Sequence, residues 1–116
     1  MDIPKQMQDQ LAQFEQLRGQ VQMLTNQKAH MEAQAKEVEH AIDELEKVDK
    51  KAPIYKSIGS VLVKAKDVKT VKKELTEQKD TLDIRIKAIS KQEESVKEKY
   101  LELQQKINQA FDKMSG

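Results

Sequence analysis

The fold is decided by the stretch Pro53-Ile54-Tyr55-Lys56-Ser57-Ile58-Gly59-Ser60-Val61-Leu62-Val63-Lys64. It is rich in β-branched and aromatic residues, which favour pleated strands. Gly59-Ser60 separates two such runs and is a two-residue turn signal. Pro53 cannot continue a helix, and it restricts the residue before it to extended geometry. We therefore expect a β-hairpin at about residues 53–65.

A single two-stranded hairpin is at best marginally stable in water, and its free edges invite pairing with another chain. We expect this hairpin to be an assembly point, with its apolar side chains buried between subunits. Glycine reaches a positive φ at little cost, so Gly59 is expected in the turn. The predicted oligomerisation surface comprises Ile54, Tyr55, Ile58, Gly59, Val61, Leu62 and Val63.

Long helices are predicted on both sides of the hairpin, over about residues 4–50 and 68–114. Their apolar residues recur at steps of three and four, which is the pattern of a coiled-coil seam. Asp67 is the expected N-cap of the second helix, with Thr70 as the alternative. Lys28, Gln78 and Gln92 are polar exceptions on the seam. The predicted seam consists of Met7, Leu11, Phe14, Leu17, Val21, Leu24, Met31, Ala35, Val38, Ile42 and Leu45, and of Val68, Val71, Leu75, Leu82, Ile86, Ile89, Val96, Tyr100, Leu103, Ile107, Ala110 and Met114.

The connection between the helices is short, which forces them into an antiparallel pair. The expected fold is mostly α: a long antiparallel two-helix coiled coil joined by one β-hairpin, in a single domain over residues 1–116. The composition agrees, with 35% charged and 3% aromatic residues. Such a chain cannot build a large compact core, but its helical apolar spacing argues against disorder.

The bulk properties narrow the classes of partner. With 21 basic and 20 acidic residues the net charge is +1, so no strong basic arm for nucleic acid is apparent. Cysteine is absent, and no signal peptide is recognisable at the start of the sequence. The longest strongly aliphatic run, Val61-Leu62-Val63, is far too short to span a bilayer. We expect a soluble, cytoplasmic protein without a membrane partner.

No catalytic, cofactor or metal site is predicted. His30 and His40 are ten residues apart and do not make the i, i+4 pair of a helical metal site. The three glycines form no phosphate loop, and no nucleophile lies near a base. The lysine pairs at 50–51 and 72–73 are a weak nucleic-acid patch, which is more simply explained by solubility or by an acidic neighbouring subunit.

The helix ends near the two termini carry apolar faces broader than a two-helix seam requires. Coiled-coil ends fray, so these side chains are expected to be partly exposed. An exposed apolar patch indicates a binding surface, although ordinary seam packing would explain the pattern equally well. The candidate tip residues are Ile3, Met7, Leu11, Phe14, Ile107, Ala110, Phe111 and Met114.

The order helix, Pro53 to Val63, helix resembles the beta subunits of prefoldin over essentially the whole chain. The Gln-rich start at residues 10–17 and the later Gln92-Glu93 belong to the same resemblance. Prefoldin alpha subunits have two hairpins between their helices. The connection from Pro53 to Lys66 has room for only one, which places the chain in the beta class.

The resemblance implies a hexamer of two alpha and four beta subunits, whose hairpins form an intersubunit β-barrel. It also implies an ATP-independent chaperone whose coiled-coil tips capture unfolded proteins and deliver them to a group II chaperonin. Two other classes remain open: a structural coiled-coil spacer that binds no client, and a nucleic-acid-binding helical arm. Failure to suppress aggregation would support the spacer, and salt-dependent RNA binding would support the arm.

Overall fold

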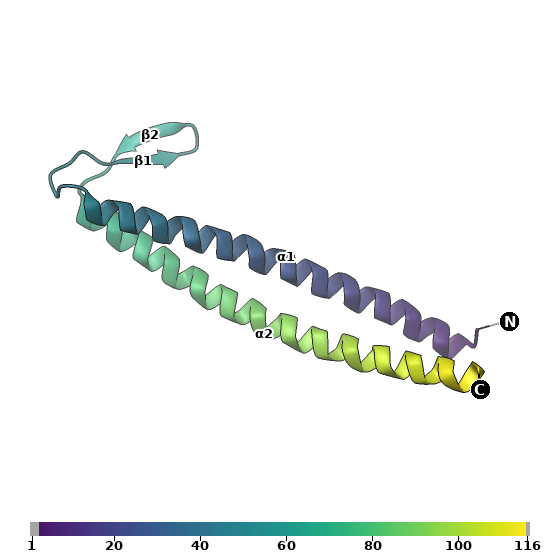
Figure 1. Cartoon of the computed structure of the whole chain (residues 1–116). Coiled ribbons are helices and arrows are strands. Elements are labelled where there is room, and N and C mark those ends of the chain that lie inside the picture. The colour runs from purple at the N-terminus through teal and green to yellow at the C-terminus, as the bar shows by residue number, and fades with distance from the viewer. Residues whose placement is uncertain (1–2, 116) are drawn as a thin grey trace. The chain divides into compact units, whose positions relative to one another are not determined.

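The computed structural model describes residues 3–115 and consists of two long helices joined by a two-stranded hairpin (Figure 1). The elements are α1 (Lys5–Lys47), β1 (Tyr55–Ile58), β2 (Val61–Lys64) and α2 (Val68–Ser115). The fold class predicted from the sequence is confirmed. Within the described residues, neither helix has a segment apolar and long enough to cross a membrane.

Helix α1 ends earlier than the periodicity predicts, at Lys47 rather than near residue 50. The cause is a turn around Asp49. Its side-chain Oδ1 accepts a hydrogen bond from the Lys51 N–H at 3.0 Å. Its carbonyl accepts one from the Ala52 N–H, also at 3.0 Å. An aspartate that binds its own backbone in this way offers the chain an alternative to the helix.

The chain forms two compact units. One contains the described residues 3–29 and 87–115, and the other contains His30–Ile86 with the hairpin. Each unit pairs a segment of α1 with a segment of α2. Phe14 lies against Tyr100 in the first unit, whereas Thr25, further along α1, bonds Glu93, which comes earlier in α2. The helices of this unit therefore run antiparallel.

The hairpin-bearing unit has a small core of Ala35, Val38 and Leu82. Partly buried Ile42, Leu75 and Ile86 pack against it. All six were predicted seam residues. At the start of α2, the Asp67 Oδ1 accepts a hydrogen bond from the Thr70 N–H at 2.6 Å, which confirms the predicted N-cap.

The Asp67 cap is also an electrostatic feature. Thr70, first through its side chain and then through its backbone N–H, holds the pKa of the Asp67 carboxyl below its ordinary value. Lys66 and Lys69 lower it further, while burial opposes them. The carboxylate therefore stays ionised at the positive end of the helix dipole, where negative charge is favoured.

The first unit is held by a second row of buried apolar side chains. Its members, all predicted, are Met7, Leu24, Ile89, Leu103 and Ile107. The rings of Phe14 and Tyr100 stack with their centroids 4.6 Å apart and their planes 17° apart. Aromatic pairs of this kind add about 0.5–1.5 kcal/mol to the effect of area burial.

Two predicted polar seam positions are wrong by one residue. Gln78 and Gln92 are exposed, whereas Lys79 and Glu93 are partly buried. Along a seam, the steps between apolar residues can be three then four or four then three. The period alone therefore does not decide which of two adjacent residues occupies the position between them. Glu93 rather than Gln92 occupies the seam position, because Glu93 can pair with Lys28 on the facing helix segment.

Glu93 makes a polar contact across the first unit. Its Oε2 accepts a hydrogen bond from the Thr25 hydroxyl at 2.7 Å, and its Oε1 lies 3.7 Å from the Lys28 Nζ. The Glu93 side chain is only 15% exposed. The Thr25 bond is the main cause that lowers the pKa of Glu93, with Lys28 and Lys97 adding to it and burial opposing it. Polar pairs on a seam help to fix register.

We predict that Leu82→Ala lowers the free energy of unfolding by about 2–4 kcal/mol, because it removes a buried core side chain. Ile84→Ala is the matched control. Its side chain is two residues away and 70% exposed, so the loss should stay within about 0.5 kcal/mol. Urea unfolding followed by circular dichroism gives both values. Equal losses for the two variants would contradict the assigned core.

We predict that Glu93→Gln makes thermal stability less dependent on pH in the acid range. A carboxyl whose folded-state pKa is lowered stabilises the fold above its unfolded pKa, and this stabilisation is lost as the pH falls through the folded value. The melting temperatures of wild type and variant should differ most near neutrality and converge in acid. Glu94→Gln, at an exposed neighbouring position, is the control. A difference that stays constant with pH would contradict the assigned role of Glu93.

Candidate functional site

The hairpin is built as the sequence predicts. Ile58 pairs with Val61 and Tyr55 with Lys64, so Gly59 and Ser60 form a two-residue loop. Gly59 has a φ of 60°, and no other described residue has a positive φ. A positive φ at the first loop position alone matches a type II′ turn, whose twist suits the flanking strands. A side chain in place of Gly59 would be strained there.

The register divides the hairpin into two faces, because directly opposed residues on an antiparallel pair point to the same side. One face carries Lys56, Ile58, Val61 and Val63, and the other carries Tyr55, Ser57, Leu62 and Lys64. Lys56 forms an ion pair with Glu74 of α2, so the first face is turned toward the helices.

A cavity of about 550 Å³ lies between the hairpin and the helices of the same unit. Its lining includes Leu45 and Val48 of the α1 side, Ile54 and Ile58 of the hairpin side, and Leu75 of α2. Ile54 is partly buried there. The hairpin therefore touches its own helices without closing against them, and room for further apolar side chains remains.

Five apolar side chains of the hairpin are exposed on the isolated chain. The exposed fractions are 58% for Tyr55, 61% for Ile58, 57% for Val61, 71% for Leu62 and 44% for Val63. They lie on both faces of the hairpin. Contiguous apolar exposure of this kind marks an interaction site on a protein surface. Within residues 3–115, the rest of the chain leaves at least 44% of each of these side chains exposed.

The candidate tip residues lie in the first unit, where the start of α1 and the end of α2 are side by side (Figure 1). The structure divides them into three groups. Met7 and Ile107 are buried in the seam. Ile3 and Phe111 are exposed by 38% and 42%. The others are partly buried, namely Leu11, Phe14, Ala110 and Met114. The freely exposed apolar surface is thus narrower than the sequence pattern suggests.

Sequence reasoning missed three exposed apolar side chains along the helices. They are Met23 and Leu101 in the first unit and Ile84 in the second, all more than half exposed. Leu101 lines a hollow of about 300 Å³ with Val21 and Tyr100, and Met23 lines another of about 420 Å³ with Leu24 and Val96. The available signal was that all three are apolar residues off the heptad stripe.

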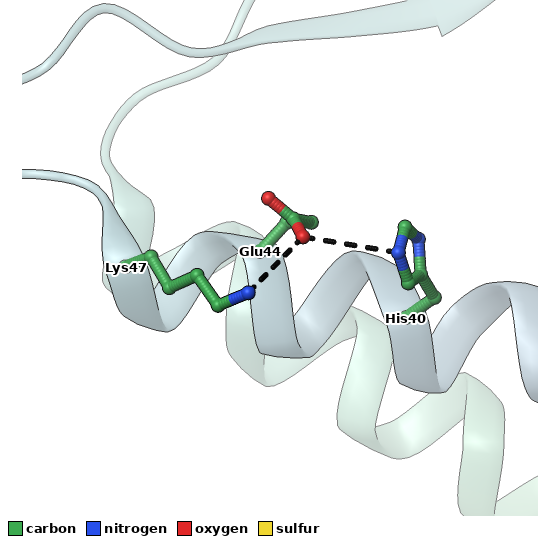
Figure 2. Close-up of polar contacts among 3 residues, drawn as sticks. All are labelled: His40, Glu44 and Lys47. Atoms are coloured by element: carbon green, nitrogen blue, oxygen red, sulfur yellow. Dashed lines mark hydrogen bonds and ion pairs between the residues drawn. The ribbon is translucent and has the colours of Figure 1, made fainter.

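Several titratable groups form ion pairs on the helix surface. Figure 2 shows Glu44 between His40 and Lys47 on α1, at 3.8 Å from the His40 Nε2 and 3.4 Å from the Lys47 Nζ. All three side chains are more than half exposed, so such pairs contribute little to stability. Among the described residues, no three His, Cys, Asp or Glu side chains gather in a metal-binding group.

On α2, Lys79 and Asp83 form a similar pair at 3.2 Å. The hydrogen bond to Asp83 and the charge of its carboxylate raise the pKa of Lys79, with smaller contributions from Glu39 and Asp80 and a burial effect in the opposite direction. A lysine with a raised pKa stays protonated at neutral pH and is a poor nucleophile or base. The pair is an i, i+4 ion pair along α2.

The fold and these surfaces define a class: an antiparallel coiled-coil subunit with one uncovered hairpin. The comparisons with known proteins identify the family. The model of the family described as Prefoldin subunit matches residues 8–114. The chain is 43% identical to the prefoldin subunit beta of Archaeoglobus fulgidus, over 99% of this chain and 98% of that protein. The chain belongs to the prefoldin family.

Other relatives agree in length and fold. The prefoldin subunit beta of Methanothrix thermoacetophila is 39% identical, over 97% of this chain and 93% of its own. The crystal structure of the prefoldin beta subunit from Thermococcus strain KS-1 superposes with a TM-score of 0.84 at 34% identity, covering 94% of this chain and 95% of that one. The family resemblance recognised in the sequence is confirmed.

Proposed function

We propose that this chain is the beta-class subunit of an ATP-independent chaperone that holds unfolded proteins. The subunits assemble through their hairpins into a hexamer of two alpha and four beta chains, in the cytoplasm. The coiled-coil ends capture unfolded clients and deliver them to a group II chaperonin. The observation that carries the proposal is the exposed apolar hairpin, supported by membership of the prefoldin family.

The proposed assembly is supported by the incomplete packing of the hairpin. Its two strands have free edges, both faces expose apolar side chains, and a cavity remains behind it. Neighbouring hairpins can pair at the edges and bury Ile58, Val61 and Val63 in a shared barrel. Apolar burial contributes about 25 cal/mol per Å², and edge pairing removes the hazard of an open strand.

Client capture is assigned to the end of the first unit. Ile3 and Phe111 provide the exposed apolar area, and Leu11, Phe14, Ala110 and Met114 of the same unit are partly buried. Met7 and Ile107 are buried in the same unit. Apolar contact is non-directional and scales with area, which suits clients of no fixed sequence. It also requires no nucleotide, in keeping with capture without ATP.

Each single end offers little apolar surface, so its affinity for a client is expected to be weak. Several ends carried by one hexamer bind the same unfolded chain at a high effective concentration. Assembly and capture are therefore coupled: hairpin pairing makes weak ends effective. Exposed Met23 and Leu101, in the same unit, could extend the contact along the helices.

We predict that the triple variant Ile58→Thr, Val61→Thr, Val63→Thr no longer assembles. Threonine keeps the strand preference and, at Val61 and Val63, the shape, but each buried hydroxyl without a partner costs about 1–3 kcal/mol. Association should weaken at least about 100-fold while helix content by circular dichroism is unchanged. Ile84→Thr, which changes an exposed apolar residue outside the hairpin, is the control. A complex of unchanged mass by sedimentation velocity would refute assembly through the hairpin.

We predict that Ile3→Gln with Phe111→Gln impairs client capture and leaves assembly intact, because it removes only the exposed apolar area of the end. An aggregation-prone protein is diluted from denaturant beside each assembled complex, and light scattering is recorded. Scattering should rise toward the level without chaperone. Met23→Gln with Leu101→Gln is the matched variant along the helices. If the end variant suppresses aggregation as well as wild type, the ends do not bind clients and a spacer role is favoured.

A further inference from the structure

Lysines are concentrated where α1 ends and α2 begins. From residue 47 to residue 73 the chain has nine lysines and two aspartates, although its net charge is only +1. The nine are Lys47, Lys50, Lys51, Lys56, Lys64, Lys66, Lys69, Lys72 and Lys73. Glutamates on the neighbouring helix turns offset part of this excess of positive charge. The ion pairs of each lysine therefore show how much positive charge remains.

Three of the lysines are neutralised within the chain. Lys47 pairs with Glu44, Lys56 with Glu74, and Lys72 with Glu46 at 3.0 Å. The other six have no carboxylate within 4.0 Å among the residues that the structure describes. We call these six the lysine base: Lys50, Lys51, Lys64, Lys66, Lys69 and Lys73.

The two aspartates in the segment do not cancel the lysine base. Asp49 accepts a hydrogen bond from the Lys51 N–H in the turn after α1. Asp67 caps α2 through the Thr70 N–H. Both carboxylates serve the backbone, and two negative charges against six positive ones leave the end of the unit basic.

The lysine base borders a hollow of about 490 Å³ between the end of α1 and the start of α2. Its apolar lining is Leu45, Val48 and Val68, and Val48 is 41% exposed. Its charged lining is Lys50, Lys69, Lys72, Glu46 and Asp67. Glu46 pairs with Lys72 and Asp67 caps the helix, which leaves Lys50 and Lys69 for a partner. This chemistry fits a carboxylate next to an apolar side chain.

Assembly through the hairpin brings lysine bases together. Lys64 is the last residue of β2, and Lys66 follows two residues later. Strand β2 is four residues long, about 13 Å, so two copies joined at their strands carry these lysines on the same small sheet. Charges within about 10 Å interact appreciably at 0.1 M salt. Two such bases repel, whereas an acidic surface opposite the lysine base attracts it and speeds the encounter.

We infer that the lysine base selects an acidic neighbour in the assembly: a related subunit whose surface beside its hairpin carries carboxylates, in preference to a second copy of this chain. The neighbour places a carboxylate and an apolar side chain in the hollow at Lys50 and Lys69. This inference rests on the proposed hairpin assembly and is independent of client capture.

The test uses this chain as its own acidic neighbour. Lys50→Glu, Lys66→Glu and Lys69→Glu are combined in a base variant, and a carboxylate at position 69 also suits the first turn of a helix. Lys36→Glu, Lys87→Glu and Lys91→Glu are combined in a control variant with the same change in charge, at exposed positions elsewhere on the helices. Labelled wild type is titrated with wild type, base variant or control variant at about 0.02, 0.1 and 0.5 M NaCl.

Wild type should associate with the base variant about tenfold more tightly than with itself at the lowest salt, and the advantage should vanish as salt screens it. Self-association of wild type should strengthen with salt. Equal binding of base and control variants would overturn the inference. So would binding of a labelled random-sequence RNA that only the base variant loses, because the lysines would then serve nucleic acid.

The failure of the proposed function is distinguishable. If the mixtures follow the expected salt dependence but the complexes do not suppress aggregation, client capture is wrong and the inference stands. If no mixture associates at any salt, both hairpin assembly and the selection of an acidic neighbour are wrong.

Discussion

The hairpin cannot bury its own apolar side chains, and the rest of the molecule depends on this constraint. Two strands of four residues have no third strand to form a core, and they touch their helices over a cavity. Such an element by itself adds little to the stability of the chain, because its apolar side chains stay exposed. The proposed assembly gives this hairpin a role, because other subunits would complete its exposed surface.

The helices are stabilised in the opposite way, within the chain itself. Their seams bury small rows of Ala, Val, Leu and Ile, and the described residues include no large side chain that is fully buried. Stability in such a seam comes from many modest contacts, each with a neighbour on the facing helix. Thr25, Lys28 and Glu93 help to fix the register of the two helix segments, because the Glu93 carboxylate must lie opposite its two polar partners.

Local chemistry made much of the fold predictable. The strands, the turn at Gly59 and the cap at Asp67 depend on residues close in sequence. The end of α1 was missed because a hydrogen bond from Lys51 to Asp49 competes with the helix. The choice of Glu93 over Gln92 depends on Lys28, far away in the sequence, and no period encodes it. The exposure of Met23, Ile84 and Leu101 was not predicted, because these apolar residues lie outside the heptad positions.

The candidate tip was the least predictable part, for a reason that also bears on its function. A side chain cannot fill the seam and contact a client at the same time. Met7 and Ile107 are committed to the seam, and freeing them would open the helices. Under the proposed function, apolar surface for a client therefore has to come from side chains that the seam leaves exposed, such as Ile3 and Phe111. The sequence shows which residues are apolar, but only the packed pair of helices shows which of them remain free.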